Sequence, residues 1–330
     1  MEKIRIGLIG CGGIAHGHMQ RLDATGNAEI VALADPNPAM IEKIQKAFPK
    51  LESAQKFADY KEMLEKVKLD AVGIFSPHTL HFQQAMDSLD KDSHVLLEKP
   101  MVCTVEHAKK LIAKIEKKKK VLLVSYQRHY MPAFRYMREL ISSGKFGKVR
   151  FVSAMQCQNW YISQKGTWRQ KKELSGGGQL NDSGSHLVDI ILWITGLEPS
   201  EVFGYIDNMG TPIDINSALS IKFKNGAQAA ISVVAESPIF LEEITIWGEN
   251  GVFYYCTHTG VLMHQGGELN KPAEQVQISD PTSNPDANII NVILGKEKNE
   301  SPAIGGLRVA ELTEAAWKSG ETGKPVGVSP

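Results

Sequence analysis

The segment IRIGLIGCGGIA occupies residues 4–15 and joins a short apolar run to a glycine-rich turn. An apolar run bounded by glycines predicts a buried strand, a tight turn and the start of a helix, whose amides can receive a dinucleotide pyrophosphate. In this pattern Gly10 permits the turn, Gly12 lets the backbone approach the phosphates, and small Ala15 lets the helix pack closely on the strand. Glycine turns between strand and helix also serve plain packing, so the G-x-G-x-x-A match alone is weak evidence for a nucleotide site.

An acidic residue closes the next apolar run. Asp35 follows IVALA at residues 30–34, at about the distance where this fingerprint places a carboxylate for the ribose hydroxyls. A loop aspartate that caps the next helix would give the same pattern. Pro36, Asn37 and Pro38 follow and provide no arginine or serine for a 2′-phosphate, so the sequence predicts NAD rather than NADP. The cofactor-binding candidates in this part of the chain are Gly10, Gly12, Gly13, Ile14 and Asp35.

Apolar strands and helix-like segments continue to alternate up to about Tyr126. Further strands are predicted near residues 70–75, 93–97 and 121–125, which indicates a parallel, doubly wound sheet. At 330 residues the chain is too long for one ordinary core and suits two domains. We therefore predict an α/β protein whose residues 1–126 form an NAD-binding Rossmann domain.

The pattern changes after residue 126. A helix is predicted at residues 131–142 and a strand at 149–155, and several strand-like runs follow between 201 and 263. Asn225-Gly226 and Asn250-Gly251 each lie between two such runs, and these dipeptides favour the left-handed conformations of tight hairpin turns. The spacing predicts a large, open and mainly antiparallel sheet.

The second predicted domain covers residues 127–330 and is α+β in class. Residues 266–288 are rich in glycine, proline, asparagine and aspartate and are predicted to form a loop. A last helix is predicted at residues 307–319, and it has the option of packing back towards the first domain. A broad one-sided sheet of this kind exposes apolar area that a partner can cover.

Bulk composition excludes several classes of partner. The chain has 37 basic and 37 acidic residues, so its charge gives no reason to expect nucleic acid or a membrane surface as a ligand. Its four cysteines are far apart and form no C-x-x-C pair, which is typical of a reducing cytosol. The first predicted strand begins at Ile4, which leaves no room for a signal peptide, and no apolar run approaches the length of a membrane span. We expect a soluble, cytoplasmic protein.

One candidate for catalytic chemistry follows the fourth predicted strand of the first domain. Glu98-Lys99-Pro100 comes directly after residues 94–97, so Lys99 lies at the carboxyl end of a parallel strand. Ligands of doubly wound sheets bind at that edge. A surface lysine ahead of a proline turn is the alternative interpretation.

A second candidate is the segment GGGQLNDSGSH at residues 176–186, which precedes a helix predicted at 187–195. Asp182 and His186 are four residues apart at a helix start, so they share one face and can meet a common ligand. An aspartate at a helix N-cap and a hydrogen-bonded histidine at the edge of a core helix are the alternatives.

These motifs, together and in this order, resemble those of the Gfo/Idh/MocA oxidoreductase family, named after glucose-fructose oxidoreductase and inositol dehydrogenase. The resemblance rests on the N-terminal glycine turn, on Ser76-Pro77-His78 with His81, on Glu98-Lys99-Pro100, and on the pattern GGG-x-x-x-D-x-G-x-H-x-x-D over residues 176–189. It extends over essentially the whole chain, including the final segment AWKSGETGKPV. Four motifs in the right order are far more specific than any one of them.

The resemblance implies a nicotinamide enzyme that oxidises a ring carbinol, or reduces the ketone, of a sugar, a sugar derivative or a cyclic polyol. It also implies that Lys99, Asp182 and His186 form the catalytic set. Hydride leaves carbon only as the hydroxyl loses its proton, so a base of near-neutral pKa is needed, and the ordinary histidine value of about 6.5 suits that role. We predict that His186 is the base, that Lys99 donates to the same oxygen, and that Asp182 orients the imidazole or holds a neighbouring hydroxyl.

Further cofactor contacts are implied by the resemblance, from Ser76, Pro77, His78, His81, Glu98 and Lys99. The family more often has asparagine where this chain has His78, so we expect His78 to alter cofactor affinity or to add a titrating group near the nicotinamide. His78 and His81 are also spaced like a metal pair, but no third ligand suggests itself nearby, so we predict no metal site.

Substrate contacts are expected from the second domain. Aromatic faces and planar donors suit sugar rings and their hydroxyls, which makes candidates of Arg128, His129, Trp160, Tyr161, Trp168 and Arg169. Ordinary packing or subunit contact is the alternative for these side chains. Gly176–Gly178 is predicted to be either a lid hinge or a place where the backbone approaches the substrate closely.

Two other functions remain open on the sequence. One is an NAD-dependent glycosidase that oxidises its sugar transiently, and the other is a dinucleotide-sensing regulator without catalysis. The presence of Lys99, Asp182 and His186 together argues against the regulator, which needs no proton-transfer set. The resemblance also implies a homodimer or homotetramer formed through the sheet of the second domain.

Overall fold

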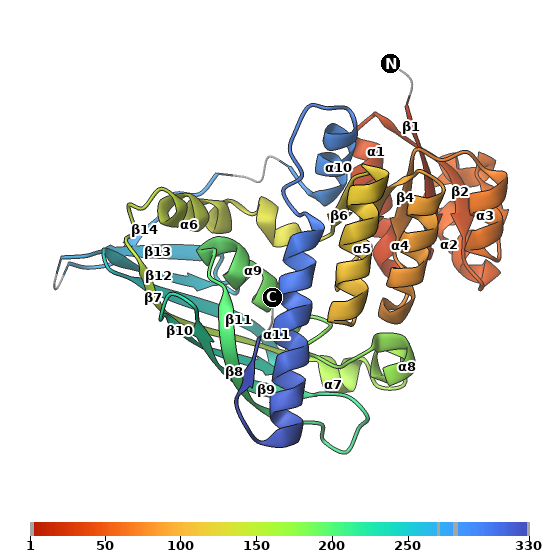
Figure 1. The fold of residues 1–330 in the computed structure, drawn as a ribbon. Coiled ribbons are helices and arrows are strands. Elements are labelled where there is room, and N and C mark those ends of the chain that lie inside the picture. Colours follow the sequence, from red (N-terminus) through yellow and green to blue (C-terminus); the bar gives the residue numbers. More distant parts are fainter. Residues whose placement is uncertain (1–2, 269–270, 280–282, 329–330) are drawn as a thin grey trace. The chain divides into compact units, whose positions relative to one another are not determined.

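The computed structural model describes residues 3–268, 271–279 and 283–328, and the chain divides into two compact units (Figure 1). Unit 1 comprises Met1–Val102, Glu106–Gln127 and Thr282–Leu307. Unit 2 comprises Cys103–Val105, Arg128–Pro281 and Arg308–Pro330. Residues 282–307 therefore belong to the same unit as the N-terminal part of the chain, which the sequence did not indicate.

The described part of unit 1 is built on a six-stranded parallel sheet with the order β3-β2-β1-β4-β5-β6. Its strands are β1 (Ile4–Ile9), β2 (Ala28–Ala34), β3 (Gln55–Phe57), β4 (Ala71–Ile74), β5 (His94–Leu97) and β6 (Leu122–Val124). The order reverses beside β1, since β2 and β3 lie on one side of it and β4, β5 and β6 on the other. This confirms the predicted doubly wound topology, whose ligands bind at the carboxyl ends of the strands near the reversal.

Helices connect these strands. They are α1 (Gly13–Ala24), α2 (Pro38–Ala47), α3 (Tyr60–Lys66), α4 (His81–Asp90) and α5 (Val105–Lys118). Asn37 caps α2 and Asp59 caps α3, each by accepting a hydrogen bond from a backbone N–H in the first helical turn. Short polar side chains therefore set where these two helices begin.

A helix from the C-terminal part of the chain completes the core of unit 1. This helix, α10 (Pro285–Ile293), packs against α1 (Figure 1), and its Ile289 and Ile290 join a buried cluster that includes Leu22 and Leu96. The prediction of a loop over residues 266–288 is therefore wrong at its end. Asn284 caps α10 and a proline occupies its first position, and both are signals of a helix start.

The described part of unit 2 is built on a nine-stranded sheet with the order β14-β13-β12-β11-β7-β10-β9-β8-β15. Its strands are β7 (Val149–Asn159), β8 (Pro199–Asp207), β9 (Asn216–Phe223), β10 (Gln228–Val234), β11 (Glu236–Gly248), β12 (Gly251–Cys256), β13 (Val261–Gly266), β14 (Glu274–Gln275) and β15 (Val326–Gly327). Among these strands β7 and β10 pair in parallel and the other pairs are antiparallel. The predicted mainly antiparallel sheet is confirmed, although β14 lies within the predicted loop.

Both predicted hairpins form, but Gly226 is the one residue of the two Asn-Gly pairs in the left-handed conformation, and Gly251 is already the first residue of β12. Asn225-Gly226 joins β9 to β10, and Asn250-Gly251 joins β11 to β12; both pairs of strands are antiparallel. Side chains then alternate between the two faces of the sheet, as in β9, where Leu219 and Ile221 are buried and Ser220 is exposed. One face of the sheet is therefore apolar and covered, and the other is open.

Helices of unit 2 pack on the covered face of the sheet (Figure 1). α6 (Pro132–Ser142) and α9 (Gly184–Thr195) pack on each other, and α9 also packs on β7; α7 (Trp160–Ser163) and α8 (Lys172–Ser175) are short. α11 (Ala303–Thr322) belongs to unit 1 up to Leu307 and to unit 2 beyond it. The predicted last helix is confirmed and extends further at both ends.

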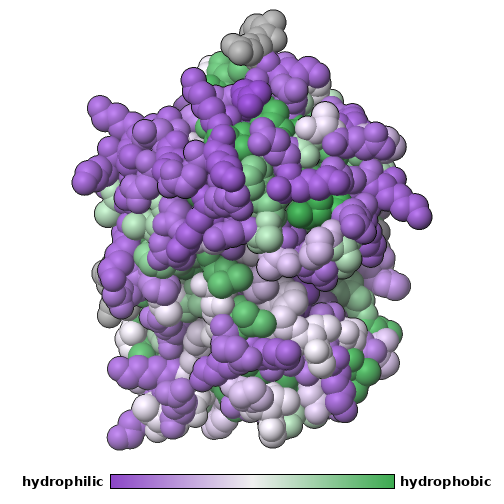
Figure 2. Space-filling model, turned by 90° about the vertical axis from the view of Figure 1, so that its right-hand side faces the viewer, coloured by the Kyte–Doolittle hydropathy of each residue, from purple (hydrophilic) through white to green (hydrophobic). Residues whose placement is uncertain are grey.

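The surface shown in Figure 2 is largely hydrophilic, with hydrophobic side chains in small separate patches. Within the described residues, no helix is both long enough and apolar enough to cross a membrane.

Candidate active site

The turn after β1 requires glycine at its first position. Gly10 has a φ of 88°, in the left-handed region that side chains disfavour. A Cβ placed on Gly10 would lie 2.8 Å from the backbone carbonyl carbon of Phe75 and 2.9 Å from the backbone nitrogen of Ser76. The turn thus lies in close contact with the segment that follows β4, which agrees with the prediction that Gly10 permits a tight turn.

The next two glycines border open space. A Cβ on Gly12 or on Gly13 would meet no other described atom within 4 Å. α1 begins at Gly13, and Gly12 supplies no side chain to cap it. The Ala15 amide donates to the Gly12 carbonyl at 3.1 Å, which leaves the amides of Gly13 and Ile14 for an anion. Ala15 is fully buried, and the Ile14 side chain is exposed at 47%. These residues fit a dinucleotide pyrophosphate.

Asp35 lies beside this turn at the end of β2. Its Oδ2 accepts a hydrogen bond of 2.9 Å from the Cys11 amide, and its Oδ1 accepts one of 2.9 Å from the Asn37 amide. The carboxylate therefore stands next to the glycine turn, as the predicted ribose contact requires, while the cap of α2 is Asn37.

His81 connects the loops that follow β4 and β5. Its ring is fully buried, with Nδ1 2.8 Å from the carbonyl oxygen of Pro100 and Nε2 3.0 Å from that of Ser76. Burial lowers the pKa of the ring. His78 is buried as well, and its ring centroid lies 5.8 Å from that of His81. His81 thus contacts both loops, and as a neutral ring it donates to one of the two carbonyls. No group of three potential metal ligands occurs among the described residues.

Lys99 lies at the carboxyl end of β5, as predicted. The amide of Glu98 donates to the carbonyl of Ile74 on β4 at 3.0 Å, which fixes this loop to the neighbouring strand. The Glu98 side chain is buried and its Oε2 accepts a hydrogen bond of 3.1 Å from the Lys99 amide. Because β1, β4 and β5 are neighbours, the glycine turn, Ser76 and Lys99 follow adjacent strands at one edge of the sheet.

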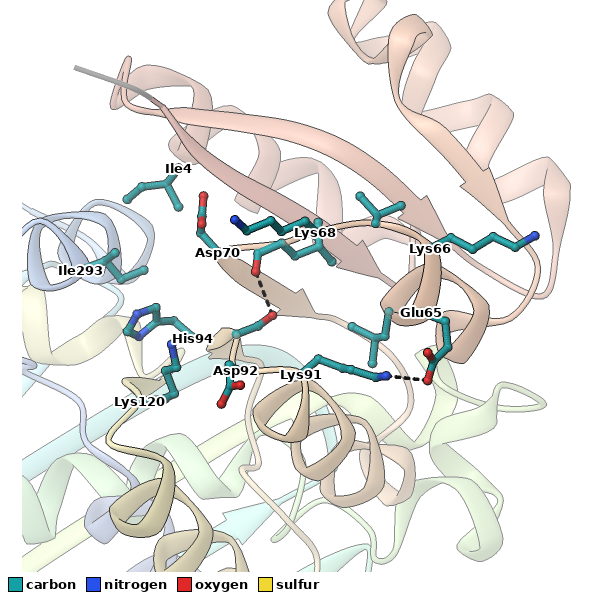
Figure 3. A pocket seen from close by; sticks show the side chains of 14 residues that line it. Ile4, Glu65, Lys66, Lys68, Asp70, Lys91, Asp92, His94, Lys120 and Ile293 are labelled. Atoms are coloured by element: carbon teal, nitrogen blue, oxygen red, sulfur yellow. Dashed lines mark hydrogen bonds and ion pairs between the residues drawn. The ribbon is translucent and has the colours of Figure 1, made fainter.

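Unit 1 also has a pocket at the opposite edge of its sheet (Figure 3). Its volume is about 710 Å³, and it is lined by residues at the amino ends of β1, β4 and β5, among them Ile4, Asp70 and His94. Charges of both signs surround it, and Lys91 pairs with Glu65 at 2.6 Å. Since dinucleotides bind at the carboxyl ends of such strands, this pocket is not part of the candidate site.

In unit 2 three of the predicted substrate-binding residues, Trp160, Trp168 and Arg169, lie near the carboxylate of Asp182. Asp182 is buried, and its Oδ2 accepts hydrogen bonds from Trp160 Nε1 at 2.8 Å and from Arg169 Nε at 3.0 Å. The guanidinium of Arg169 also stacks over the ring of Trp168, 4.5 Å from its centroid. The aromatic and planar side chains named from the sequence thus hold Asp182 in place.

His186 lies in the first turn of α9, four residues after Asp182, and is half-buried. The N-cap of this helix is Ser183, so Asp182 does not act as the cap. The hydroxyl of Ser185 donates to the carbonyl of Asp182 at 2.6 Å, and the amide of His186 donates to the carbonyl of Ser183 at 3.1 Å, so both catalytic candidates lie in one hydrogen-bonded turn.

The glycine run before Asp182 packs against its own unit. A Cβ on Gly178 would lie 1.7 Å from the carbonyl oxygen of Asp214, and one on Gly177 would lie 2.4 Å from the ring of Trp317. The close approach that these glycines allow is therefore to Asp214 and Trp317, which neither predicted role for residues 176–178 anticipated.

Asp214 anchors this run, and the sequence did not single it out. Its fully buried carboxylate accepts hydrogen bonds from the amides of Gly178 at 2.8 Å and Leu180 at 2.7 Å and from Trp317 Nε1 at 2.9 Å. Burial raises the pKa of this carboxyl, and the three donors act in the opposite direction. The three successive glycines were the available signal that another group lies against this loop.

Two predicted substrate contacts have carboxylate partners inside unit 2. Arg128 Nη2 lies 2.7 Å from Glu242 Oε2, and His129 Nε2 lies 2.7 Å from Asp189 Oδ2. The buried ring of His129 also stacks on Trp193 at 4.4 Å. His129 therefore has packing contacts within unit 2, and Tyr161 packs at the edge of a small core around Trp160 and Ile213.

Both halves of the chain match models of one protein family. Residues 4–126 match the GFO_IDH_MocA model, described as an oxidoreductase family with an NAD-binding Rossmann fold. Residues 134–254 match the GFO/IDH/MocA C-terminal domain.

Individual relatives are distant. The chain is 31% identical over 185 residues to YteT of Bacillus subtilis (strain 168), a match that spans 54% of this chain and less than half, 42%, of that protein. It is 24% identical to the D-glucoside 3-dehydrogenase of Escherichia coli (strain K12), over 98% of this chain and 97% of the relative. The WlbA dehydrogenase of Bordetella pertussis, solved in complex with NADH and UDP-GlcNAcA, has the same fold, with a TM-score of 0.84, 24% identity and full coverage of both chains.

Mutation can distinguish the structural role of Gly10, which contacts the backbone, from the proposed cofactor-binding role of Gly12, which borders open space. We expect Gly12→Ala to leave the unfolding temperature of the cofactor-free protein unchanged, because its Cβ enters open space, and to weaken NADH binding at least about tenfold. Thermal unfolding and a fluorescence titration with NADH measure the two effects.

Gly10→Ala is the matched control. We expect it to lower the unfolding temperature markedly, because its Cβ would collide with the backbone of Phe75. Wild-type affinity for NADH in Gly12→Ala would contradict the assignment of this turn to the pyrophosphate.

Proposed function

Since the chain belongs to the Gfo/Idh/MocA oxidoreductase family and carries its NAD-binding Rossmann domain, we propose that it is an NAD-dependent dehydrogenase of a sugar, sugar derivative or cyclic polyol. The reaction moves a hydride between the nicotinamide and a secondary carbinol or ketone. The observation that supports this proposal is that each motif residue suited to proton transfer lies where its motif predicts, Lys99 at the carboxyl edge of the unit 1 sheet and Asp182 and His186 on one turn of unit 2. The E. coli relative acts on D-glucosides, and WlbA binds a nucleotide sugar, which supports the substrate class.

In this proposal the side chains of the protein transfer the proton of the substrate hydroxyl and stabilise the oxygen that it leaves. His186 accepts the proton of the substrate hydroxyl during oxidation and returns it during reduction. Lys99 donates a hydrogen bond to the same oxygen and stabilises the developing alkoxide. Trp160 and Arg169 keep the carboxylate of Asp182 in one orientation, from which it orients the imidazole or holds a neighbouring hydroxyl. Bound NAD supplies the hydride acceptor.

A substrate panel with two variants tests these roles. We expect NAD reduction with an aldose, sugar acid, inositol or amino sugar, and we expect His186→Ala and Lys99→Ala each to lower kcat about 100-fold or more. Lys117→Ala, at an exposed position of α5, is the control and should retain wild-type kcat.

The same panel separates the other two functions. Release of free sugar from an aryl glycoside without net NADH would identify a glycosidase that oxidises its sugar transiently. Tight NAD binding without turnover on any compound would identify a sensor.

We also propose that the physiological cofactor is NAD. The carboxylate of Asp35 beside the glycine turn suits the ribose hydroxyls, whereas a 2′-phosphate would face a like charge. We expect kcat/KM for NAD to exceed that for NADP at least about tenfold, and Asp35→Ser to reduce this ratio. Steady-state kinetics with both cofactors measure it, and a clear preference of the wild type for NADP would refute the proposal.

The open face of the unit 2 sheet is proposed as the subunit interface of a homodimer or homotetramer. Strand register places Phe203, Ser220, Ala230, Ser153, Thr245, Tyr254 and Met263 in one row across this face. Most of these side chains are small or apolar, and Tyr205 on the same face is exposed at 73%. A partner sheet would remove this surface from water.

A charge in the centre of this face tests the interface. We expect Ala230→Glu to shift the protein towards monomer in sedimentation velocity, because the carboxylate would be buried against a second apolar sheet. Ala113→Glu, at an exposed position of α5, is the matched control. A wild type that sediments as a monomer, or an oligomer that survives Ala230→Glu, would count against this interface.

A further inference from the structure

Helix α1 carries a histidine that lies wholly inside unit 1 and has no part in the proposed chemistry. His18 is 0% exposed, and its ring stacks on that of Phe75 with 4.2 Å between centroids. Its Nδ1 lies 2.7 Å from Asp286 Oδ1, on α10, and its Nε2 lies 2.8 Å from Glu98 Oε1, in the loop after β5. The ring therefore connects three segments that are distant in the sequence.

The contacts of both ring nitrogens favour one charge state of this ring when the two carboxylates are ionised. An ionised carboxylate only accepts hydrogen bonds, so a ring with a carboxylate oxygen at each nitrogen must donate from both. A neutral imidazole has one N–H, whereas an imidazolium has two. The contacts of His18 with Glu98 and Asp286 are thus those of an imidazolium.

The surrounding charges balance this state. Arg21, one turn along α1, donates from Nε to Asp286 Oδ2 at 2.5 Å, so two cations face two carboxylates. The charged groups that face His18 are Asp286 from α10 and Glu98 from the β5 loop, while Phe75 covers the ring. Burial opposes the charge, but hydrogen bonds to Asp286 and Glu98 outweigh it and raise the pKa of His18 to about 9.

The side chain of Glu98 connects His18 to the backbone of the candidate catalytic lysine, Lys99. One oxygen of its carboxylate faces His18, and the other accepts the Lys99 amide at 3.1 Å. The carboxylate is therefore a bridge between the imidazolium and the backbone from which the Lys99 side chain extends. Loss of the His18 charge would remove one end of this bridge.

We propose that His18 is a positioning residue: as an imidazolium between Asp286 and Glu98 it fixes the Glu98 carboxylate and, through it, the backbone of Lys99. This inference rests on the proposed dehydrogenase function for its catalytic consequence. Its structural part, the charge of His18 and the order of the Lys99 segment, does not depend on any substrate.

The charge of His18 is measured directly by NMR on protein labelled at histidine Cε1. The signal missing from His18→Gln belongs to His18, and we expect it to remain that of an imidazolium at pH 7.5 and to titrate near pH 9. A neutral His18 ring at pH 7.5 would overturn the proposal.

The stability of the fold should follow the same titration. The pKa of His18 is raised in the folded state above its ordinary value of 6.5, so its contribution is fully present below about pH 6.5 and is lost as the pH rises through about 9. The difference in unfolding temperature between wild type and His18→Gln should therefore shrink between pH 6.5 and pH 10. A difference that stays constant over this range would contradict the charged ring.

Hydrogen exchange reports on the lysine segment without any substrate. In His18→Gln at pH 7 we expect the peptide that contains the Lys99 amide to exchange at least tenfold faster than in wild type. His258→Gln, an exposed histidine of unit 2, is the matched control and should leave the exchange of this peptide unchanged. Unchanged exchange in His18→Gln would overturn the positioning role.

Turnover then tests the catalytic consequence. We expect His18→Gln to lower kcat about tenfold with KM for NAD within a factor of three, because the hydrogen bond from Lys99 acts on the developing alkoxide. An unchanged kcat would overturn this part of the proposal. A wild type that turns over no compound of the panel defeats the proposed function alone, since NMR and hydrogen exchange still decide the role of His18.

Asp286→Asn is the second variant, for the case in which His18→Gln does not fold. It keeps the histidine and removes one of the two carboxylates that hold its proton. We expect the His18 titration to move to lower pH by at least one unit. A titration that stays at the wild-type pH would overturn the proposal.

Discussion

The cofactor half of this protein depends on one backbone contact, between Gly10 and the chain that leaves β4. A Cβ at Gly10 would lie 2.8 Å from the carbonyl carbon of Phe75, and the φ of 88° disfavours a side chain there as well. Because glycine satisfies both conditions, β1 can end tightly against β4 and α1 can begin at once. The first amides of α1, the carboxylate of Asp35 and the loop that carries Lys99 then gather at one edge of the sheet.

Buried carboxylates hold the loops that carry the candidate catalytic residues in both units. Asp214 accepts three N–H donors beneath the glycine run that precedes Asp182, and Glu98 lies between His18 and the Lys99 amide. An ionised carboxylate away from water is costly unless donors surround it. Each loop therefore has few arrangements of low free energy. This restricts the backbone near Asp182 in one loop and at Lys99 in the other.

Local patterns predicted much of this organisation. The glycine turn, the alternating strands and helices, and the Asn-Gly hairpins all depend on side chains close together in the sequence. Side-chain chemistry alone did not reveal which partners these residues have within the protein. Trp160, Arg169 and His129 were all named as suitable for a sugar, yet Trp160 and Arg169 hold Asp182 while His129 pairs with Asp189, 60 residues further on.

The sequence by itself determined the α/β and α+β organisation and the strand–turn–helix after β1, because periodicity and turn chemistry are properties of neighbouring residues. Lys99, Asp182 and His186 were singled out by the resemblance of their motifs to those of a family. Only the tertiary structure decided which charges meet in the interior. His18 and Asp286 are 268 positions apart, and Asp214 lies 36 residues from the Gly178 amide it accepts. The sequence around a histidine or an aspartate does not show whether water or a buried partner surrounds its side chain. The packing of distant segments decides this.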